Sequence, residues 1–222
     1  MKDKYAEIKK YWDDIFHSSP VNIDFIKSEI PIKEIEDSIM WVSKCNGTLL
    51  DFGCGNGTLL LRAIYLSGSE GMGLDISHEA IKSAQKASRE LNFSGHVEFI
   101  QDSMGYLETL EKNSFRGVIL SNVLDNLLPS DGLKLLELIK RKLIKGGRFF
   151  LKLNDYKERQ QMIDDGAIEI MDNVFKESEG LYLWNLNNET VRSMFESDFQ
   201  IETVKSIELM GTVNRTYHMI KK

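Results

Sequence analysis

The sequence predicts an α/β fold in which a mostly parallel sheet is covered by helices on both faces. From Thr48 onward, short apolar runs alternate with longer amphipathic patterns, as strands and helices do in this fold class. The run from Phe115 to Ser121 is apolar almost throughout, which is typical of a strand buried on both faces. A glycine-rich turn joins the first apolar run to a helical pattern, as at the ligand-binding edge of such sheets.

The elements can be assigned in chain order. Residues 1–45 contain two amphipathic helical patterns separated by Ser18-Ser19-Pro20, and we expect them to form an N-terminal helical lid. Residues 46–222 are expected to form the main domain. Its strands are predicted from residue 49 and at 71–75, 97–101, 115–121 and 148–153, and its helices at 58–66, after the N-cap Ser77, from Pro129 to Gly146, and at 188–196.

Two later segments complete the chain. Residues 155–187 are less regular and rich in acidic residues and Met, and we expect an insert or a second lid segment there. Two strand patterns meet across residues 210–212, which predicts a closing hairpin.

The composition and charge of the chain disfavour several classes of function. The chain has 222 residues, 42% of them hydrophobic and 28% charged, as in an ordinary globular protein, and its net charge of -6 disfavours binding of nucleic acid through phosphate neutralisation. No apolar run approaches the ~20 residues that span a bilayer, and the charged start is unlike a signal peptide, so we expect a cytoplasmic protein. Two cysteines, Cys45 and Cys54, suggest neither a disulfide framework nor a metal site.

The glycine-rich turn at residues 49–57, LLDFGCGNG, is the most informative stretch. Glycine is needed where the backbone has positive φ or where a ligand must approach the main chain closely. A dinucleotide fingerprint would require a third glycine at position 58, where the chain has Thr58. Instead Gly53, Gly55 and Gly57 are spaced two apart, and Asp51 lies two residues before the first of them.

This Asp-x-Gly-x-Gly-x-Gly pattern resembles motif I of the class I S-adenosylmethionine-dependent methyltransferases. The resemblance implies a Rossmann-like sheet of seven strands in the order 3-2-1-4-5-7-6, with the last strand antiparallel. It also implies S-adenosyl-L-methionine as cofactor and S-adenosyl-L-homocysteine as product. A carboxylate at position 51 suits this ligand, because the ligand carries an ammonium and a sulfonium. The resemblance is specific over residues 45–154 and general elsewhere.

Two further acids extend the resemblance. Asp75 ends the strand predicted at residues 71–75, one strand-helix-strand unit after Asp51, where the family has a carboxylate that accepts from the ribose hydroxyls. Asp102 follows the strand predicted at 97–101, where the family has the residue that accepts from the adenine amino group. The implied cofactor-binding residues are Asp51, Gly53, Cys54, Gly55, Asn56, Gly57, Asp75, Ile76, Gln101, Asp102, Ser103, Met104, Ser121, Asn122 and Val123, with Tyr11 and Trp12 from the lid.

The roles of some of these residues have alternatives. Cys54 is expected to be a small filler within the turn. Tyr11, Trp12 and Phe16 form a helical aromatic stripe that either packs internally or, as the Tyr-Trp helix of the resembled small-molecule enzymes does, closes over the cofactor and excludes water.

The methyl acceptor is expected near residues 121–126, after the fourth strand. This segment, SNVLDN, lacks the Asn-Pro-Pro-Tyr and Pro-Cys sequences of enzymes that methylate amino nitrogens and cytosine C5. Asp125 is our first candidate for a general base or for orienting the acceptor, with an exposed acid near a helix start as the alternative. His218 and His17 are weaker candidates, and each is also consistent with a structural or surface histidine.

Other acceptor-side features remain open. Tyr182 and Trp184 either line the acceptor pocket or are buried against the sheet. Asp125 and Asp155 could mimic the magnesium carboxylates of catechol-type enzymes, but helix capping by Asn154 or Asp155 is the favoured alternative, and we expect no metal.

The sequence therefore predicts methyl transfer from S-adenosyl-L-methionine to the O, N, S or C atom of a small molecule by in-line displacement. The expected partner is this small-molecule acceptor, without a membrane or nucleic acid, in a monomer or homodimer. An RNA or protein methyltransferase, a non-catalytic cofactor-binding protein and a nicotinamide dehydrogenase are the alternatives.

Overall fold

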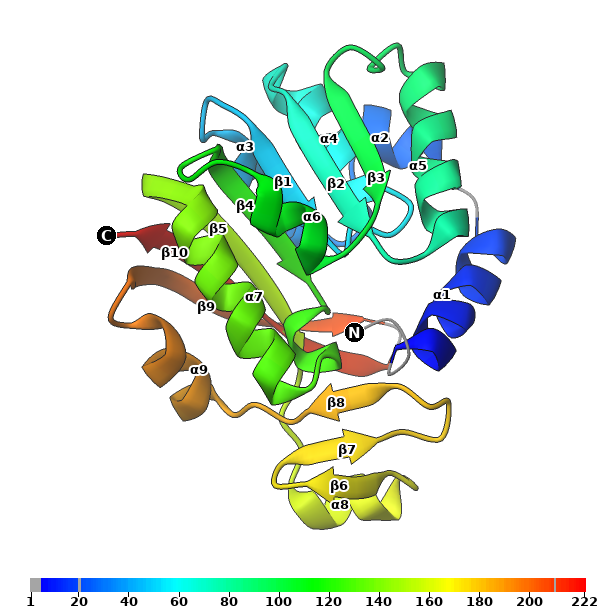
Figure 1. Ribbon diagram of the computed structural model, residues 1–222, viewed down its shortest axis with the longest axis vertical. Coiled ribbons are helices and arrows are strands. Elements are labelled where there is room, and N and C mark those ends of the chain that lie inside the picture. Colours follow the sequence, from blue (N-terminus) through cyan, green and yellow to red (C-terminus); the bar gives the residue numbers. More distant parts are fainter. Residues whose placement is uncertain (1–4, 20, 210) are drawn as a thin grey trace.

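A seven-stranded sheet of order β3-β2-β1-β4-β5-β10-β9 forms the centre of the protein (Figure 1). Figure 1 draws a computed structural model, which describes residues 5–19, 21–209 and 211–222. The strands are β1 (Leu49–Phe52), β2 (Gly71–Asp75), β3 (Val97–Gln101), β4 (Phe115–Ser121), β5 (Leu143–Asn154), β9 (Phe199–Leu209) and β10 (Thr212–Lys221). Strands β1 to β5 are parallel, and β10 pairs antiparallel with β5 and β9. The expected order, with the last strand antiparallel, is confirmed.

Helices cover both faces of this sheet. One face packs against α2 (Ile23–Lys27), α3 (Lys33–Ser43), α4 (Thr58–Ser67) and α5 (His78–Glu90). The other packs against α6 (Met104–Thr109), α7 (Pro129–Lys142) and α9 (Asn188–Phe195). The short 3-10 helix η1 (Leu124–Asn126) follows β4, and α1 (Ala6–Ser18) packs against α5. This doubly covered architecture is the predicted fold class.

The second N-terminal helical pattern is divided, in contrast to the single helix that we expected. Helix α2 ends at Lys27 and α3 begins at Lys33. Pro31 lies between them, lacks an N–H and disfavours helical backbone at the residue before it. The freed N–H of Ile30 donates instead to the carboxylate of Glu36 (3.1 Å). The expected break at Pro20 and the expected hairpin tip at Met210 lie outside the described residues.

Helix α7 is shorter and β5 longer than we expected. The helix ends at Lys142, whose ammonium donates to the main-chain carbonyls of Glu108 and Leu110. Leu143 then pairs with Phe115 of β4 and is fully buried. Strand β5 therefore begins at Leu143, five residues before the predicted start at residue 148. Because the strand contains a bulge, Gly146 has a φ of 74°, which a glycine adopts without strain.

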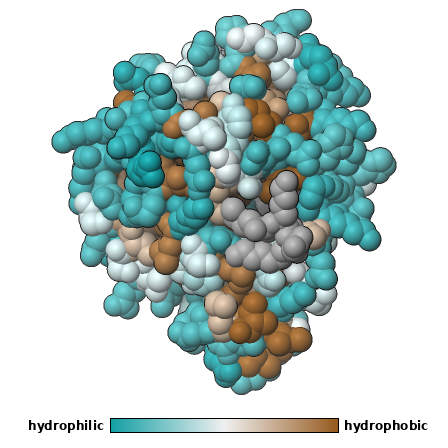
Figure 2. Space-filling model, in the orientation of Figure 1, coloured by the Kyte–Doolittle hydropathy of each residue, from teal (hydrophilic) through white to brown (hydrophobic). Residues whose placement is uncertain are grey.

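The insert forms a small unit of its own. Helix α8 (Arg159–Asp164) and an antiparallel sheet of β6 (Ile168–Met171), β7 (Val174–Lys176) and β8 (Tyr182–Trp184) surround a core of Met162, Ala167, Phe175 and Leu183. Figure 2 shows apolar residues gathered on the surface at this end of the molecule, where Ile168 of the edge strand β6 is 69% exposed. Strand β8 packs against η1, so the insert borders the carboxyl ends of the main strands. None of the described helices is long and apolar enough to cross a membrane.

A buried ion pair joins the helices on the α2–α5 face. The guanidinium of Arg62 on α4 donates through Nε and Nη2 to the carboxylate of Glu36 on α3, and through Nη1 to the carbonyl of Ile26 on α2 (2.9 Å). Both charged side chains are about 95% buried. The pair therefore fixes three helices relative to one another.

We predict that Arg62→Leu lowers the free energy of unfolding by roughly 3–5 kcal/mol, because it leaves the Glu36 carboxylate buried and unpaired. Urea denaturation measures this change. Lys33→Ala, which removes an exposed i,i+4 pair with Asp37, is the matched control and should have no resolvable effect. The double variant Glu36→Leu/Arg62→Leu should recover part of the loss; a double variant less stable than Arg62→Leu would contradict this account.

Candidate functional site

A cavity of about 690 Å³ lies at the edge of the sheet where β1 to β4 end. Its volume is that of a site for one or two small ligands. Three groups of residues line it: Phe52, Gly53, Gly55, Leu74, Asp75 and Ile76 at β1 and β2; Gln101, Asp102, Ser103, Met104, Ser121, Asn122, Val123, Asn126 and Leu127 at β3 and β4; and Tyr5, Ala6, Ile8, Lys9, Trp12 and Phe16 from the N-terminal segment. The lining is mainly apolar, with carboxylates at one end.

The glycine turn forms one wall of this cavity. Gly53 has a φ of 71°, and a Cβ atom there would lie 2.2 Å from Cγ2 of Val123. Gly57 has a φ of 81° and precedes α4, where a Cβ would lie 2.7 Å from the ring of Phe99. Both positions therefore exclude other residues through backbone conformation and through close packing. The result is a wall of exposed main chain leading to the N-terminus of α4.

Asp75 connects this turn to the next strand and helix. Its Oδ2 accepts from the N–H of Gly55 (2.8 Å) and its Oδ1 from the N–H of Ser77 (2.8 Å). Burial raises the pKa of Asp75, and these two backbone hydrogen bonds oppose the shift. The carboxylate thus faces the cavity in a fixed orientation.

Asp51 lies beneath the turn and is not among the lining residues. It is 1% exposed, and neither carboxylate oxygen has a hydrogen-bond partner among the described residues. Burial, together with the negative charge of Asp75, raises the pKa of Asp51 well above its ordinary value. A buried carboxylate without a partner is costly, so this position calls for a donor or a cation.

Asp102 follows β3, so in the row of three strand-end acids it lies on the far side of Asp75 from Asp51. Its Oδ1 accepts from the N–H groups of Ser103 (2.5 Å) and Tyr106 (3.3 Å) at the start of α6. The side chain therefore both orders the start of α6 and lines the cavity. Together, Asp51, Asp75 and Asp102 lie at the ends of neighbouring strands, as their spacing predicted.

Helix α1 crosses the cavity and is attached at both ends. At the first end, the Tyr5 hydroxyl donates to Asp131 (2.7 Å) and accepts from the N–H of Leu128 (3.2 Å), while its ring packs edge-on against Tyr182. In the second half of the helix, Asp13 accepts from the Ser77 hydroxyl (2.7 Å) at the start of α5, and His17 near the C-terminal end contacts Glu79. The helix therefore covers the cavity as a lid.

The Asp13 attachment is supported by a second bond and by a neighbouring contact. Asp13 also accepts from the N–H of Glu79 (3.3 Å), and His17 contacts the Glu79 carboxylate (3.3 Å). His17 is thus at the lid attachment and not among the cavity lining. Trp12 and Phe16 line the cavity, whereas Tyr11 packs edge-on against Trp12 outside it.

Asp125 is buried behind the cavity. Its Oδ2 accepts from the N–H of Asn154 on β5 (2.6 Å), and its Oδ1 has no partner among the described residues. Burial raises the pKa of Asp125 to about 6, although Lys152 and Arg215 oppose the shift. Its side chain points toward β5 and not into the cavity lining.

A polar network next to Asp125 fixes Asn122, which does line the cavity. The Asn122 amide donates to Oδ1 of Asn154 (3.0 Å) and of Asn214 (3.1 Å), and its Oδ1 accepts from the Lys152 ammonium. Burial lowers the pKa of Lys152 to about 8. Every polar atom of the Asn122 side chain is therefore used within the protein.

His218 lies apart from the cavity. It is on β10, four residues from Asn214, which at ~3.3 Å per residue is roughly 13 Å along the strand. Its ring stacks on Trp41 (centroids 4.5 Å apart), its Nε2 contacts the Ser38 hydroxyl, and burial lowers its pKa to about 4. These contacts attach α3 to the sheet.

The structure brings most, but not all, of the predicted cofactor residues to the cavity. Those that lie behind or beside it are Asp51, Cys54, Asn56, Gly57 and Tyr11. Phe16, for which closure over the cofactor was one of two interpretations, lines it. The lining residues that were not predicted are Tyr5, Ala6, Ile8, Lys9, Phe52, Leu74, Asn126 and Leu127. The spacing of Tyr5, Ile8, Trp12 and Phe16 along one helix face was the available signal for the lid residues.

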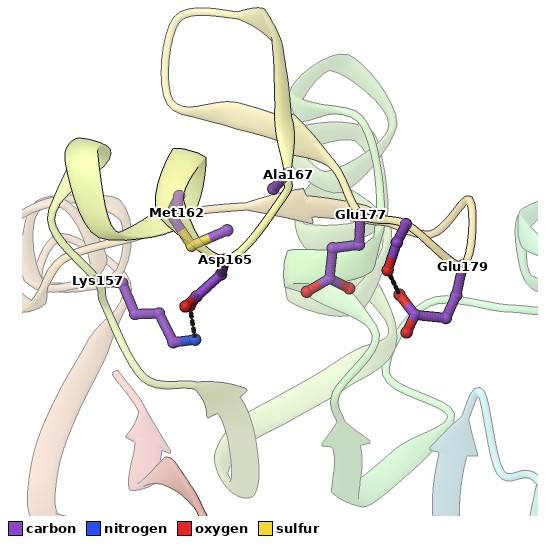
Figure 3. A pocket seen from close by; sticks show the side chains of 7 residues that line it. Lys157, Met162, Asp165, Ala167, Glu177 and Glu179 are labelled. Carbon is purple, nitrogen blue, oxygen red and sulfur yellow. Dashed lines mark hydrogen bonds and ion pairs between the residues drawn. The ribbon is translucent and has the colours of Figure 1, made fainter.

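A smaller cavity of about 410 Å³ lies within the insert. Figure 3 shows the ion pair between Lys157 and Asp165 (2.6 Å) on one side, with Glu177 and Glu179 on the other. Burial raises the pKa of Glu177.

No group of three or more His, Cys, Asp or Glu side chains among the described residues is arranged to hold a metal ion. Asp155 pairs with Arg215 (3.3 Å), and Asn154 caps no helix.

A family model described as a methyltransferase domain matches residues 43–208, about three quarters of the chain. A ribosomal protein L11 methyltransferase of Polynucleobacter necessarius is 28% identical over 135 residues, which cover 61% of this chain and 39% of that protein. The chain thus spans about two fifths of the length of this curated relative.

Two solved structures have a similar fold. The 1,6-didemethyltoxoflavin-N1-methyltransferase of Burkholderia thailandensis, with bound 1,6-didemethyltoxoflavin and S-adenosylhomocysteine, gives a TM-score of 0.72 at 12% identity, covering 98% of this chain and 88% of that chain. Magnesium protoporphyrin IX methyltransferase of Synechocystis PCC 6803, with bound S-adenosylmethionine, gives 0.64 at 17% identity, covering 96% and 90%.

The raised pKa of Asp125 leads to a prediction for stability. Because the folded protein holds the Asp125 proton more tightly than the unfolded chain does, the free energy of unfolding falls as pH rises from about 4 to about 6. The pKa difference corresponds to roughly 3 kcal/mol. Asp125→Asn cannot ionise and should therefore gain up to about 3 kcal/mol relative to the wild type between pH 4 and pH 7. Denaturant titrations that run parallel for both proteins across this range would show that Asp125 is not the source.

Proposed function

We propose that this chain, which belongs to the methyltransferase-domain family, transfers a methyl group from S-adenosyl-L-methionine to a small molecule enclosed beneath helix α1. The family is the one that the pattern from Asp51 to Gly57 predicted. One observation carries the proposal. The glycine turn and the carboxylates of Asp75 and Asp102 line a single cavity that is also lined by one face of α1.

The residues present fit this cofactor. Asp75 would accept from the ribose hydroxyls, and Asp102 and its neighbours at the end of β3 would hold the adenine. The exposed main chain at Gly53 and Gly55 would face the methionyl part. The unpartnered carboxylate of Asp51 beneath this turn suits the ammonium group, reached directly or through water. Trp12 and Phe16 would cover the ligand from the lid.

When bound, the cofactor supplies a methyl group on a sulfonium, which passes to the acceptor's lone pair while the carbon–sulfur electron pair stays on sulfur. The task of the protein is then to hold the acceptor in line and to exclude water. The fixed turn from Asn122 to Asn126 forms the wall opposite α1 for this purpose.

Enclosure by the lid supports a small acceptor. Tyr5 and Asp13 attach α1 on either side of the cavity, which favours an acceptor small enough to lie beneath the helix. The curated relative is named for ribosomal protein L11, but the match covers only two fifths of its length, so its acceptor need not be that of this chain. A solved neighbour with a bound small heterocycle favours the same interpretation.

Two measurements test the proposal. S-adenosylhomocysteine at a hundredfold excess over its Kd should stabilise the fold by about 2.7 kcal/mol, and NADH should stabilise it less. Methyl-labelled S-adenosylmethionine incubated with small-molecule extracts should yield a labelled product by mass spectrometry. A larger shift with NADH would overturn the proposal, and label found only in protein or RNA would move the acceptor to those classes.

We predict that Asp75→Asn weakens S-adenosylhomocysteine binding at least tenfold, because a charge-assisted hydrogen bond worth roughly 1.5–3 kcal/mol is lost. Isothermal titration calorimetry measures the affinity. Asp165→Asn, in the insert, is the control and should bind as the wild type does. Equal affinities for the two variants would exclude Asp75 as the ribose acceptor.

We also predict that Asp13→Ala speeds dissociation of S-adenosylhomocysteine by about tenfold. The substitution removes the two hydrogen bonds that attach the lid to the start of α5, and a charge-assisted bond contributes roughly 1.5–3 kcal/mol. Stopped-flow fluorescence, with Trp12 as the reporter, measures the rate. Asp14→Ala, one position along the same helix and exposed, is the matched control. A rate unchanged in Asp13→Ala would mean that the attachment does not govern release.

A further inference from the structure

The end of the cavity next to η1 has the composition expected of an acceptor compartment. It is lined by Tyr5, Ala6 and Ile8 of the N-terminal segment and by Asn126 and Leu127 at η1, and the bond between Leu128 N–H and the Tyr5 hydroxyl brings these two segments together. Asp75 and Asp102, at the ends of β2 and β3, line the other end of the same cavity. Ser121 belongs to that other end, because the register of β1 and β4 puts it level with Gly53.

Among the described residues, most side-chain polar atoms of this compartment already have a partner. The Tyr5 hydroxyl donates to Asp131 and accepts from the N–H of Leu128. In the Asn122 side chain, Nδ2 donates to Asn154 and Asn214, and Oδ1 accepts from the Lys152 ammonium. These bonds hold both side chains in place.

Asn126 is the exception. Its Nδ2 donates to the main-chain carbonyl of Asn122 (2.8 Å). Because a carbonyl oxygen only accepts, this bond fixes which side-chain atom is nitrogen and leaves Oδ1 as the free atom. Oδ1 makes no hydrogen bond to any described residue. Since Asn126 lines the cavity, its Oδ1 is the side-chain acceptor atom at this end that has no partner among the described residues.

The charges around the compartment disfavour an ionic ligand. The Lys9 ammonium, which belongs to the lining, is paired with Asp13. Burying a ligand charge without a partner carries a large desolvation penalty. A neutral ligand meets no such penalty.

We infer that the methyl acceptor is an uncharged, mainly apolar small molecule that donates a hydrogen bond, from an N–H or O–H group, to Oδ1 of Asn126. The inference rests on the proposed function, because it assigns the methyl acceptor to the part of the cavity that a bound cofactor would not occupy. Asn126 is then a specificity-determining residue, and Tyr5, Ile8 and Leu127 form the apolar wall.

The test uses the full chain saturated with S-adenosylhomocysteine and three matched probes. These are 2-naphthol, its methyl ether, which lacks the donor, and 6-hydroxy-2-naphthoate, which adds a negative charge. Ligand-observed NMR titration measures the three affinities. We expect 2-naphthol to bind at least threefold more tightly than the ether and tenfold more tightly than the carboxylate.

A variant then assigns the effect to one atom. Asn126→Leu should bind 2-naphthol no more tightly than the ether. If the carboxylate binds as well as 2-naphthol, if the ether does, or if none of the probes binds, the inference is overturned. The wild-type comparison decides the matter even if the variant fails to fold. Failure of S-adenosylhomocysteine itself to bind would instead reject the proposed function.

Discussion

The two hydrogen bonds accepted by the Asp75 carboxylate organise the candidate site. One comes from Gly55 in the turn after β1, and the other from Ser77 at the start of α5. A single side chain thereby joins two adjacent strand–helix connections of the parallel sheet. The turn can hold its positive-φ conformation because its N–H groups are satisfied here and at the carbonyl of Leu74. The same carboxylate faces the cavity, so the scaffold and the binding group are one residue.

This arrangement extends to the lid. The Ser77 hydroxyl donates to Asp13 of α1, so a chain of hydrogen bonds runs from Asp75 through Ser77 to the lid. A ligand that forms a hydrogen bond with Asp75 would therefore lie next to Ser77, whose hydroxyl holds Asp13 of the lid. At the far end, Tyr5 attaches α1 beside the insert and η1. The lid thus spans two differently built regions, with a carboxylate-rich end over β2 and an apolar end over η1.

Local patterns were enough to predict the glycine turn and the three strand-end acids, because each depends on neighbours within a few residues or on the regular geometry of parallel strands. The strand order came from the resemblance to the family and not from local patterns. The division at Pro31 was also readable, since proline alone accounts for it. The meeting of Tyr5 with the segment around Leu128 was not, because it joins parts of the chain more than 120 residues apart. The orientation of Asp125 likewise depends on the N–H of Asn154, which a spacing argument does not contain.

Asp51 and Asp125 are both buried and have carboxylate oxygens without a partner among the described residues, but their surroundings differ. Asp125 accepts one backbone bond and lies near the positive charges of Lys152 and Arg215, so the protein itself compensates part of its burial. Asp51 has no such compensation, since its only charged neighbour of consequence is the negative Asp75. Burial therefore favours the neutral form of Asp51. A positive group beside the glycine turn, such as the ammonium group of the proposed cofactor, would favour the ionised form instead. The ionisation of Asp51 thus depends on what the site binds, whereas that of Asp125 depends on groups within the fold.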